Sequence, residues 1–128
     1  MISNGGKPVK VAVVEDDFSL QNMYRIKLEN EGFTVGIAGN GQEGLIMAET
    51  FLPDVILLDL RMPVMDGAEM LARLREREWG STMRVIILTN ISKNEAPQSL
   101  RFLNVDRYIV KAHSTPAQVL EIVREVLS

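Results

Sequence analysis

The stretch from Val55 to Gly67, VILLDLRMPVMDG, constrains the fold more than any other part of this chain. Its apolar run, residues 55–58, has the length and composition of a buried strand and ends abruptly at Asp59. Loop-forming residues follow until Asp66 and Gly67 open a new segment. A carboxylate at the tip of a buried strand is held where water and ligands can reach it. This position therefore suits a group that reacts or binds a ligand.

Three other apolar runs end in polar residues in the same way. A single acid after a strand most often marks only the place where the chain meets solvent. Asp59 alone therefore does not indicate a functional site, and the ends of the other runs have to be considered with it. Residues 9–14 end in Glu15, Asp16 and Asp17, residues 85–88 end in Thr89, and residues 108–110 end in Lys111. If these runs lie parallel in one sheet, all four ends share one edge.

Helical patterns separate the apolar runs. Apolar residues at helical spacing between Leu20 and Leu28 predict a first helix, which Gly32 ends. Capping boxes of the N-x-x-E or D-x-x-E form predict that a second helix begins at Asn40 and a third at Asp66. These two helices are expected to end at Pro53 and Gly80. A further box at Ser92 predicts a fourth helix through Leu103, with Pro97 near its first turn, and Thr115, Pro116 and Gln118 predict the start of a fifth.

Five strands, counting a weaker one at residues 33–38, therefore alternate with five helices. This order predicts an α/β fold with a doubly wound, five-stranded parallel sheet, of the flavodoxin-like (βα)5 type, covered by helices on both faces. We expect residues 1–8 to be a flexible lead-in and residues 9–128 to form one domain.

Composition narrows the classes of function. The net charge of −3 and the lack of a basic run give no electrostatic support to nucleic-acid binding. The absence of cysteine excludes disulfides and thiolate metal sites, which fits a reducing cytoplasm. No apolar stretch approaches the roughly 20 residues that span a bilayer, so we expect no membrane segment.

The acids Glu15, Asp16 and Asp59 require a compensating charge. Carboxylates about 5 Å apart repel each other by roughly 3 kcal/mol per pair at an effective dielectric constant near 20, so a cation or raised pKa values must relieve them. A site of oxygen ligands without Cys or His favours a hard ion, and Mg²⁺ suits a site with few protein ligands. Together with the Thr89 hydroxyl and the Lys111 ammonium, these groups are the parts needed for phosphoryl transfer.

From about Lys10 to its end, the chain resembles the receiver domain of two-component response regulators. VVEDD is similar to the acidic pair of that family and aligns Glu15 and Asp16 with it, and DLRMPVMDG is similar to the loop of the phosphoacceptor, Asp59. Thr89 matches the family's switch hydroxyl, and Lys111 in YIVK its lysine. Tyr108, three residues before Lys111, matches its switch aromatic residue.

The resemblance implies a mechanism in which a sensor histidine kinase or a phosphotransfer protein supplies the phosphoryl group to Asp59. Mg²⁺ would be held by Glu15, Asp16, Asp59 and the backbone carbonyl of Arg61. Lys111 would pair with a phosphoryl oxygen. The chain would thus catalyse its own phosphorylation and dephosphorylation without being a conventional enzyme.

The resemblance also implies a switch that controls a partner or output domain. The Thr89 hydroxyl would move toward the phosphoryl group, and the Tyr108 ring would fill the vacated space. The face read by the unknown effector would consist of the fourth helix, the fifth strand and the fifth helix, and a homodimer through this face is left open.

Three residues depart from the family pattern. Ala112 stands where a proline usually follows the lysine in a cis peptide, and a cis bond before alanine costs about 2.5 to 4 kcal/mol. We therefore expect either a cis Lys111–Ala112 peptide or a trans peptide with Lys111 displaced. Asn90 is larger than the small residue that is common at this position in the family and would narrow access to Asp59. Arg61 would be able to reach the phosphoryl group.

Two other functions remain as alternatives. One is a receiver-like interaction module that signals without phosphate. The intact acid pair, Asp59, Thr89 and Lys111 argue against it, and the departures at Ala112 and Asn90 keep it open. The other is a phosphatase with an aspartate nucleophile, which would need a second Asp at the position of Arg61. The sequence leaves open whether the chain stands alone or is a piece of a longer protein.

Overall fold

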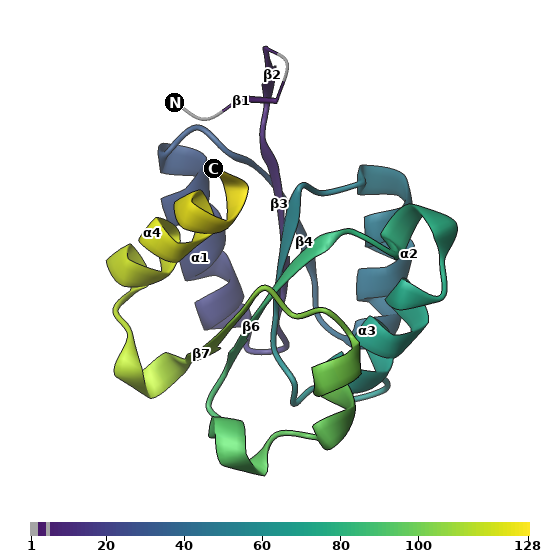
Figure 1. Cartoon of the computed structure of the whole chain (residues 1–128). Coiled ribbons are helices and arrows are strands. Elements are labelled where there is room, and N and C mark those ends of the chain that lie inside the picture. Colours follow the sequence, from purple (N-terminus) through teal and green to yellow (C-terminus); the bar gives the residue numbers. More distant parts are fainter. Residues whose placement is uncertain (1–2, 5) are drawn as a thin grey trace.

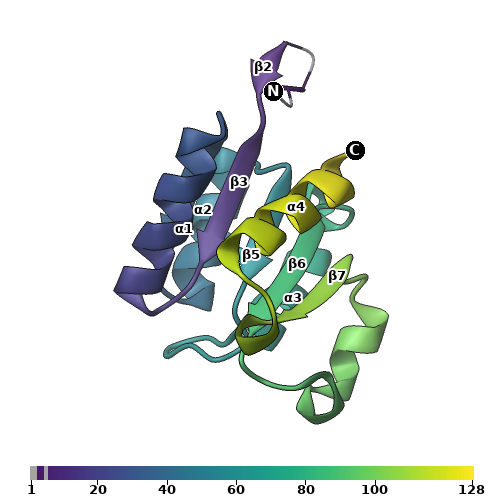
Figure 2. The same ribbon diagram turned by 90° about the vertical axis from the view of Figure 1, so that its left-hand side faces the viewer.

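A five-stranded parallel sheet forms the centre of the molecule, with the strand order β4-β3-β5-β6-β7 (Figures 1 and 2). The computed structural model describes residues 3–4 and 6–128. The strands are β3 (Lys10–Val14), β4 (Thr34–Ala38), β5 (Val55–Leu58), β6 (Arg84–Thr89) and β7 (Arg107–Val110). Each neighbouring pair is parallel, which confirms the predicted fold class.

Four α-helices cover the two faces of this sheet. Helices α1 (Phe18–Asn30) and α4 (Pro116–Leu127) pack on one face, and α2 (Gly41–Phe51) and α3 (Gly67–Arg75) pack on the other (Figure 1). Strand β5 is buried along its whole length, as expected of a central strand covered on both sides. The apolar core is accordingly split into one cluster on each face of the sheet.

Polar side chains cap α2, α3 and α4 at the residues that the sequence predicted. The side chains of Asn40 and Asp66 accept hydrogen bonds from the backbone N–H of Glu43 and Glu69 at 2.9 and 2.8 Å. Thr115 forms a complete capping box with Gln118 at the start of α4. Each cap satisfies donors that the first helical turn leaves unpaired, and so sets the residue at which the helix begins.

The predicted fourth helix is wrong. The segment contains two short 3₁₀ turns instead, η2 (Lys93–Glu95) and η3 (Gln98–Phe102). Ala96 and Pro97 between them are extended, with ψ angles of 150° and 135°. Proline lacks a backbone N–H and disfavours helical geometry in the residue before it, so the helix cannot continue through this point.

Helix α3 also ends earlier than predicted. It stops at Arg75, and the 3₁₀ turn η1 (Glu78–Gly80) follows before β6 begins. Gly80 therefore ends the 3₁₀ turn rather than the helix itself.

The N-terminal segment forms a small structure of its own. Strands β1 (Ser3–Asn4) and β2 (Lys7–Pro8) pair in an antiparallel fashion. The lead-in expected over residues 1–8 lies partly outside the described residues, because 1, 2 and 5 are not among them. Within the described part of the chain, no helix has both the length and the apolar character needed to cross a membrane.

Candidate functional site

The register of the sheet brings two acids together at its carboxyl-terminal edge. Val14 of β3 pairs with Leu58 of β5, so the residues that follow them, Glu15 and Asp59, leave the sheet side by side. The Asp59 N–H donates to the Val14 carbonyl at 3.1 Å and continues the ladder by one bond. Both acids are nearly buried, at 5% and 7% exposure, so backbone pairing fixes their position at the tip of the sheet.

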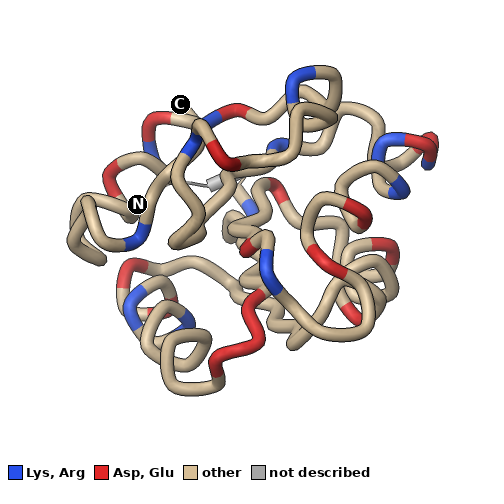
Figure 3. Tube along the Cα trace, turned by 90° about the horizontal axis from the view of Figure 1, so that it is seen from below, with Lys and Arg blue, Asp and Glu red and all other residues tan. Residues whose placement is uncertain are grey.

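A third acid joins this pair from the loop between β3 and α1. Carboxylate oxygens of Glu15, Asp16 and Asp59 lie within 4.8 Å of one another. Unlike the other two, Asp16 is exposed. Figure 3 looks at the molecule from the side of this edge and shows acidic and basic positions near each other around it. The acid cluster thus opens to solvent on the side of Asp16.

Lys111 supplies the positive charge of the site. Its Nζ donates to Oε1 of Glu15 at 2.5 Å and to Oδ2 of Asp59 at 3.0 Å. The lysine side chain is only 14% exposed. The ammonium therefore lies between two carboxylates that would otherwise repel each other without compensation.

The expectation about the Lys111–Ala112 peptide is wrong. The peptide is trans, yet the ammonium reaches Asp59. Lys111 begins the 3₁₀ turn η4 (Lys111–His113) immediately after β7. Its flexible four-carbon stem carries the charge back to the site from there, so a displaced lysine is not required.

Burial and neighbouring charges shift the pKa values of Glu15 and Lys111. Burial raises the pKa of Glu15 to about 7, although the hydrogen bond from Lys111 acts in the opposite direction. Burial disfavours the charge of Lys111, but its hydrogen bonds to Glu15 and Asp59 prevail and raise its pKa.

The loop after Asp59 is held close to the acid by a glycine. The Gly67 N–H donates to the Leu60 carbonyl at 3.0 Å. A Cβ on Gly67 would lie 2.1 Å from the carbonyl oxygen of Asp59, so only glycine permits this approach. Val64 in the same loop is 77% exposed and has a φ angle of 70°, which a β-branched residue rarely adopts.

Thr89 and Tyr108 both form side-chain hydrogen bonds with the backbone of Ile91. Thr89 is 1% exposed, and its Oγ1 accepts from the Ile91 N–H at 3.4 Å. The Tyr108 hydroxyl donates to the Ile91 carbonyl at 2.6 Å. Burial raises the pKa of Tyr108, and the charge of Asp59 adds to the effect. The two side chains are therefore linked through the segment that follows β6.

Three further residues follow members of the site closely in the chain: Arg61 after Asp59, Asn90 after Thr89 and His113 after Lys111. The Arg61 N–H donates to Oδ1 of Asp59 at 3.3 Å. All three residues are exposed. The backbone carbonyl of Arg61, which the resemblance to receiver domains assigns to the metal, remains a predicted ligand.

Gln21 is a polar residue near the site that sequence reasoning missed. It is 6% exposed, and its Nε2 donates to the carbonyls of Glu15 and Ala38, each at 3.0 Å. A signal was present, because Gln21 shares the buried face of α1 with Tyr24 and Leu28. A glutamine at such a position must be hydrogen-bonded within the protein.

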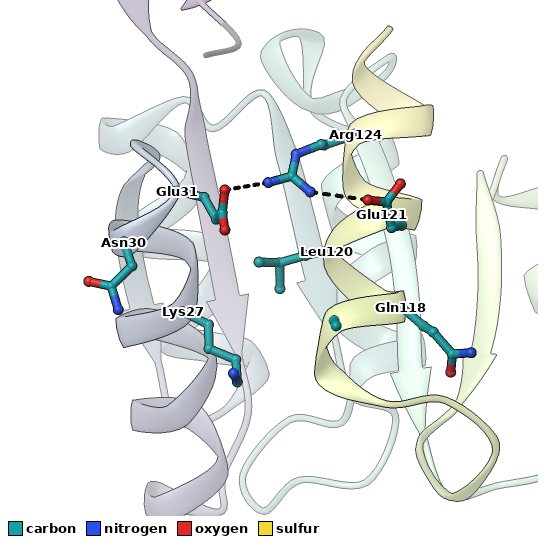
Figure 4. Close-up of a pocket in the computed structure, with 8 residues that line it drawn as sticks. Lys27, Asn30, Glu31, Gln118, Leu120, Glu121 and Arg124 are labelled. Atoms are coloured by element: carbon teal, nitrogen blue, oxygen red, sulfur yellow. Dashed lines mark hydrogen bonds and ion pairs between the residues drawn. The ribbon is translucent and has the colours of Figure 1, made fainter.

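The larger hollows of the surface lie elsewhere. A groove of about 460 Å³ separates α1 from α4, and Arg124 on its wall pairs with Glu31 at 2.5 Å and with Glu121 at 3.5 Å (Figure 4). A second groove of about 740 Å³ runs along η2, η3 and β7 and is lined in part by Tyr108. The acids of the cluster line neither groove.

The donor set fits a hard divalent cation. The grouped ligand atoms of Glu15, Asp16 and Asp59 are all carboxylate oxygens, the ligands that Mg²⁺ prefers. Sites of this kind use few protein oxygens and leave room for water and phosphate oxygens. The acidic triad is typical of the Mg²⁺ site of receiver domains.

Comparison with known proteins gives consistent matches over nearly the whole chain. The family model described as "Response regulator receiver domain" matches residues 11–124. An uncharacterized 14.6 kDa protein from the sodA1 3′ region of Leptolyngbya boryana is 35% identical over 91% of this chain and 86% of its own length. The phosphate regulon transcriptional regulatory protein PhoB of Rhizobium meliloti is 38% identical over 84% of this chain.

Solved structures show the same architecture. The chemotaxis response regulator CheY4 of Vibrio cholerae superposes with a TM-score of 0.86 at 29% identity, covering 94% of this chain and 100% of that chain. A CheY-like receiver domain protein of Methanospirillum hungatei gives the same TM-score at 28% identity, covering 94% of each chain. The chain spans 47% of the length of PhoB and 48% of that of PhoP of Bacillus subtilis.

Proposed function

Because this chain belongs to the response regulator receiver domain family, we propose that Asp59 accepts a phosphoryl group from a phosphohistidine and that phosphorylation switches a surface for a partner. Receiver domains interact with histidine kinases, and a kinase or a phosphotransfer protein would be the donor here. One observation carries the proposal. Asp59 is a nearly buried carboxylate, 3.0 Å from a lysine ammonium and grouped with two further acids.

In the proposed reaction an Asp59 oxygen attacks the phosphorus of the phosphohistidine. The new P–O bond forms as the P–N bond breaks, and the histidine nitrogen keeps the electron pair and takes up a proton. The Lys111 ammonium, which now contacts Asp59, would pair with a phosphoryl oxygen. Water later attacks the phosphorus, the bond to Asp59 breaks, and inorganic phosphate leaves.

Glu15, Asp16, Asp59 and the Arg61 carbonyl would hold Mg²⁺ beside the reacting oxygens. Bound Mg²⁺ would neutralise the charge that develops on the phosphoryl group. Lys111 partly compensates the charge of Glu15 and Asp59 through the hydrogen bonds described above. Asp16, which is exposed, supplies the solvent-facing carboxylate of the cluster.

The switch would start at Thr89. A phosphoryl group adds about −1.5 to −2 charges and three acceptor oxygens, which favours a hydroxyl donor moving toward it. Thr89 Oγ1 accepts from the Ile91 N–H, and Ile91 also holds the Tyr108 hydroxyl through its carbonyl. Movement of Thr89 would therefore loosen the hydrogen bond that keeps Tyr108 in place. Reversing a 1:99 equilibrium requires roughly 5.5 kcal/mol, the scale of a few charge-assisted hydrogen bonds.

The surface that responds would be the face formed by residues 93–103, β7 and α4. The groove of about 740 Å³ lies on this face, and Tyr108 is one of its lining residues. Phe102 beside it is 82% exposed. A downstream effector or a second copy of the chain would contact this face in the phosphorylated form.

Intact-mass measurement tests the proposal directly. The protein is incubated with Mg²⁺ and acetyl phosphate, and we expect the mass to increase by one phosphoryl group. Asp59→Ala should abolish the gain, whereas Asp17→Ser should keep it, because serine preserves the cap of α1 that Asp17 provides. If neither acetyl phosphate nor phosphoramidate adds mass, the chain acts as a phosphorylation-independent interaction module instead.

A further inference from the structure

Gln21 connects the ends of two strands next to the acid cluster. Both hydrogens of its side-chain amide are used, one on the Glu15 carbonyl and one on the Ala38 carbonyl, at 3.0 Å each. Ala38 is the last residue of β4, and its carbonyl also accepts from the Glu15 N–H at 3.0 Å. Because β4 is an edge strand, with β3 as its one neighbour in the sheet, this amide ties the edge strand to the start of the acidic loop.

The backbone of Gln21 holds the other end of the same loop. Its N–H donates to the Asp17 carbonyl at 2.9 Å. Asp17 is fixed further by capping α1 and by an N–H bond of 3.1 Å to Oε2 of Glu15. Asp16 is the residue between these two fixed neighbours. The bond to Asp17 is a main-chain helical bond, so the specific contribution of the glutamine is its amide, which holds the Glu15 side of the loop.

We propose that Gln21 is a positioning residue for the metal site: it sets the backbone from which Glu15 and Asp16 reach a divalent cation. This inference rests on the proposed function, because it assumes that the acid cluster binds Mg²⁺. Gln21 itself does not touch the cation or the phosphoryl group. It acts through the carbonyls and the loop that it holds.

Packing alone does not account for a glutamine here. The position faces the core of α1 and is 6% exposed, where an apolar side chain of similar size, such as Met or Leu, would fill the space without burying an amide. A buried amide is retained at low cost only when its hydrogens are satisfied, and here both are satisfied on the two carbonyls nearest the acid loop. The specific contribution of the glutamine is therefore to orient that loop.

The test is the Mg²⁺ affinity of Gln21→Met, measured by isothermal titration calorimetry. Methionine keeps the length and volume but has no donor. We expect the dissociation constant for Mg²⁺ to rise roughly 10-fold or more, the usual effect of losing a partner that orients metal ligands. Phe33→Leu is the matched control, because Phe33 is buried immediately before β4, at the amino-terminal end of that strand and away from the acid cluster. Its melting temperature should fall, but its Mg²⁺ affinity should equal that of the wild type.

The outcomes separate the two proposals. If the wild type binds Mg²⁺ and Gln21→Met binds it equally well, the positioning role is overturned and the proposed function stands. If the wild type binds no Mg²⁺, the proposed function itself fails. A drop in affinity in Phe33→Leu as large as in Gln21→Met would also overturn the role, because general destabilisation would then explain both.

A second measurement needs no substitution. In NMR hydrogen exchange of the wild-type chain, both Nε2 protons of Gln21 should exchange far more slowly than those of Gln42, which is exposed. Equal exchange rates for the two side chains would show that the hydrogen bonds from the Gln21 amide to the Glu15 and Ala38 carbonyls do not form in solution.

Discussion

The Lys111 ammonium lies 2.5 Å from a carboxylate oxygen of Glu15 and 3.0 Å from one of Asp59. Lys111 follows β7 and Glu15 follows β3, so this contact spans the ends of β5 and β6, which lie between these two strands. The lysine therefore offsets the charge of both acids at once.

The stability of the metal-free protein should depend on pH through Glu15. Burial raises its pKa in the folded protein to about 7 from an ordinary value of 4.5, so the folded state binds more protons than the unfolded state between these values. The free energy of unfolding should consequently fall as pH rises through this window, by about 1 to 3 kcal/mol. Urea unfolding in the presence of a chelator at pH 5, 6, 7 and 8 measures it. Glu15→Gln removes the titrating group and should flatten the curve, and an unchanged slope would contradict the assignment.

Gly67→Ala should damage both the fold and the site. The new Cβ would meet the Asp59 carbonyl oxygen at 2.1 Å, so the loop or the start of α3 must shift. We expect a loss of about 1 to 3 kcal/mol in the free energy of unfolding, together with slower phosphorylation from acetyl phosphate. Gly39→Ala is the control, because its Cβ would lie 3.6 Å from the nearest group, the Glu43 carboxylate, which is ordinary contact. Equal stability of the two variants would show that the approach of Gly67 to Asp59 is not required.

Arg75 should be among the most important charged residues for stability. Its guanidinium donates to the carbonyls of Gly80, Met83, Leu103 and Asn104 at 2.6 to 2.9 Å and joins the end of α3 to the connection before β7. Arg75→Met should lower the free energy of unfolding by about 2 to 4 kcal/mol, because several carbonyls lose a charged donor at once.

Arg73→Met provides the control on the same helix. The ion pair of Arg73 with Glu69 is exposed, at 54% and 50% of the two side chains, so its loss should cost less than about 1 kcal/mol. Chemical denaturation of both variants distinguishes the two arginines. A similar cost for both would refute the role assigned to Arg75.

Val64→Asn should stabilise the protein. Val64 has a φ angle of 70° and is 77% exposed, so its replacement relieves backbone strain without emptying the core. Asparagine tolerates this geometry, and we expect a gain of about 1 kcal/mol in the free energy of unfolding. Val64→Ala keeps a Cβ without the asparagine amide and should gain less. Destabilisation by Asn in thermal unfolding would mean that the valine side chain has a contact of its own.

Much of the fold was predictable because local patterns and the sheet rule agree. The apolar runs that became β3, β5 and β6 are short, nearly unbroken and followed by polar residues. The caps at Asn40, Asp66 and Thr115 were identified from spacing alone, because a cap bonds to a residue only three positions away. The prediction of a fourth helix failed for a local reason as well, since Pro97 interrupts the segment and Ser92 precedes only a 3₁₀ turn, without capping it through its side chain.

The candidate site was predicted as a set of residue types and not as a set of contacts. Parallel strands place their carboxyl ends on one edge, so the grouping of Glu15, Asp59 and Lys111 followed from the order of the elements. That Lys111 reaches Asp59 from a trans peptide depends on the length of its side chain and the turn that follows β7, which no pattern encodes.

The sequence alone thus determined the order of strands and helices and the edge at which the polar residues meet. Hydrophobic periodicity and the signals that begin and end helices and strands act between residues close together in the chain. Only the tertiary structure decided which atoms pair across that edge. Gln21 bonding to Ala38, and Lys111 bonding to Glu15, join residues 17 and 96 positions apart. Such contacts depend on how whole elements pack against each other, and packing is a property of the assembled chain.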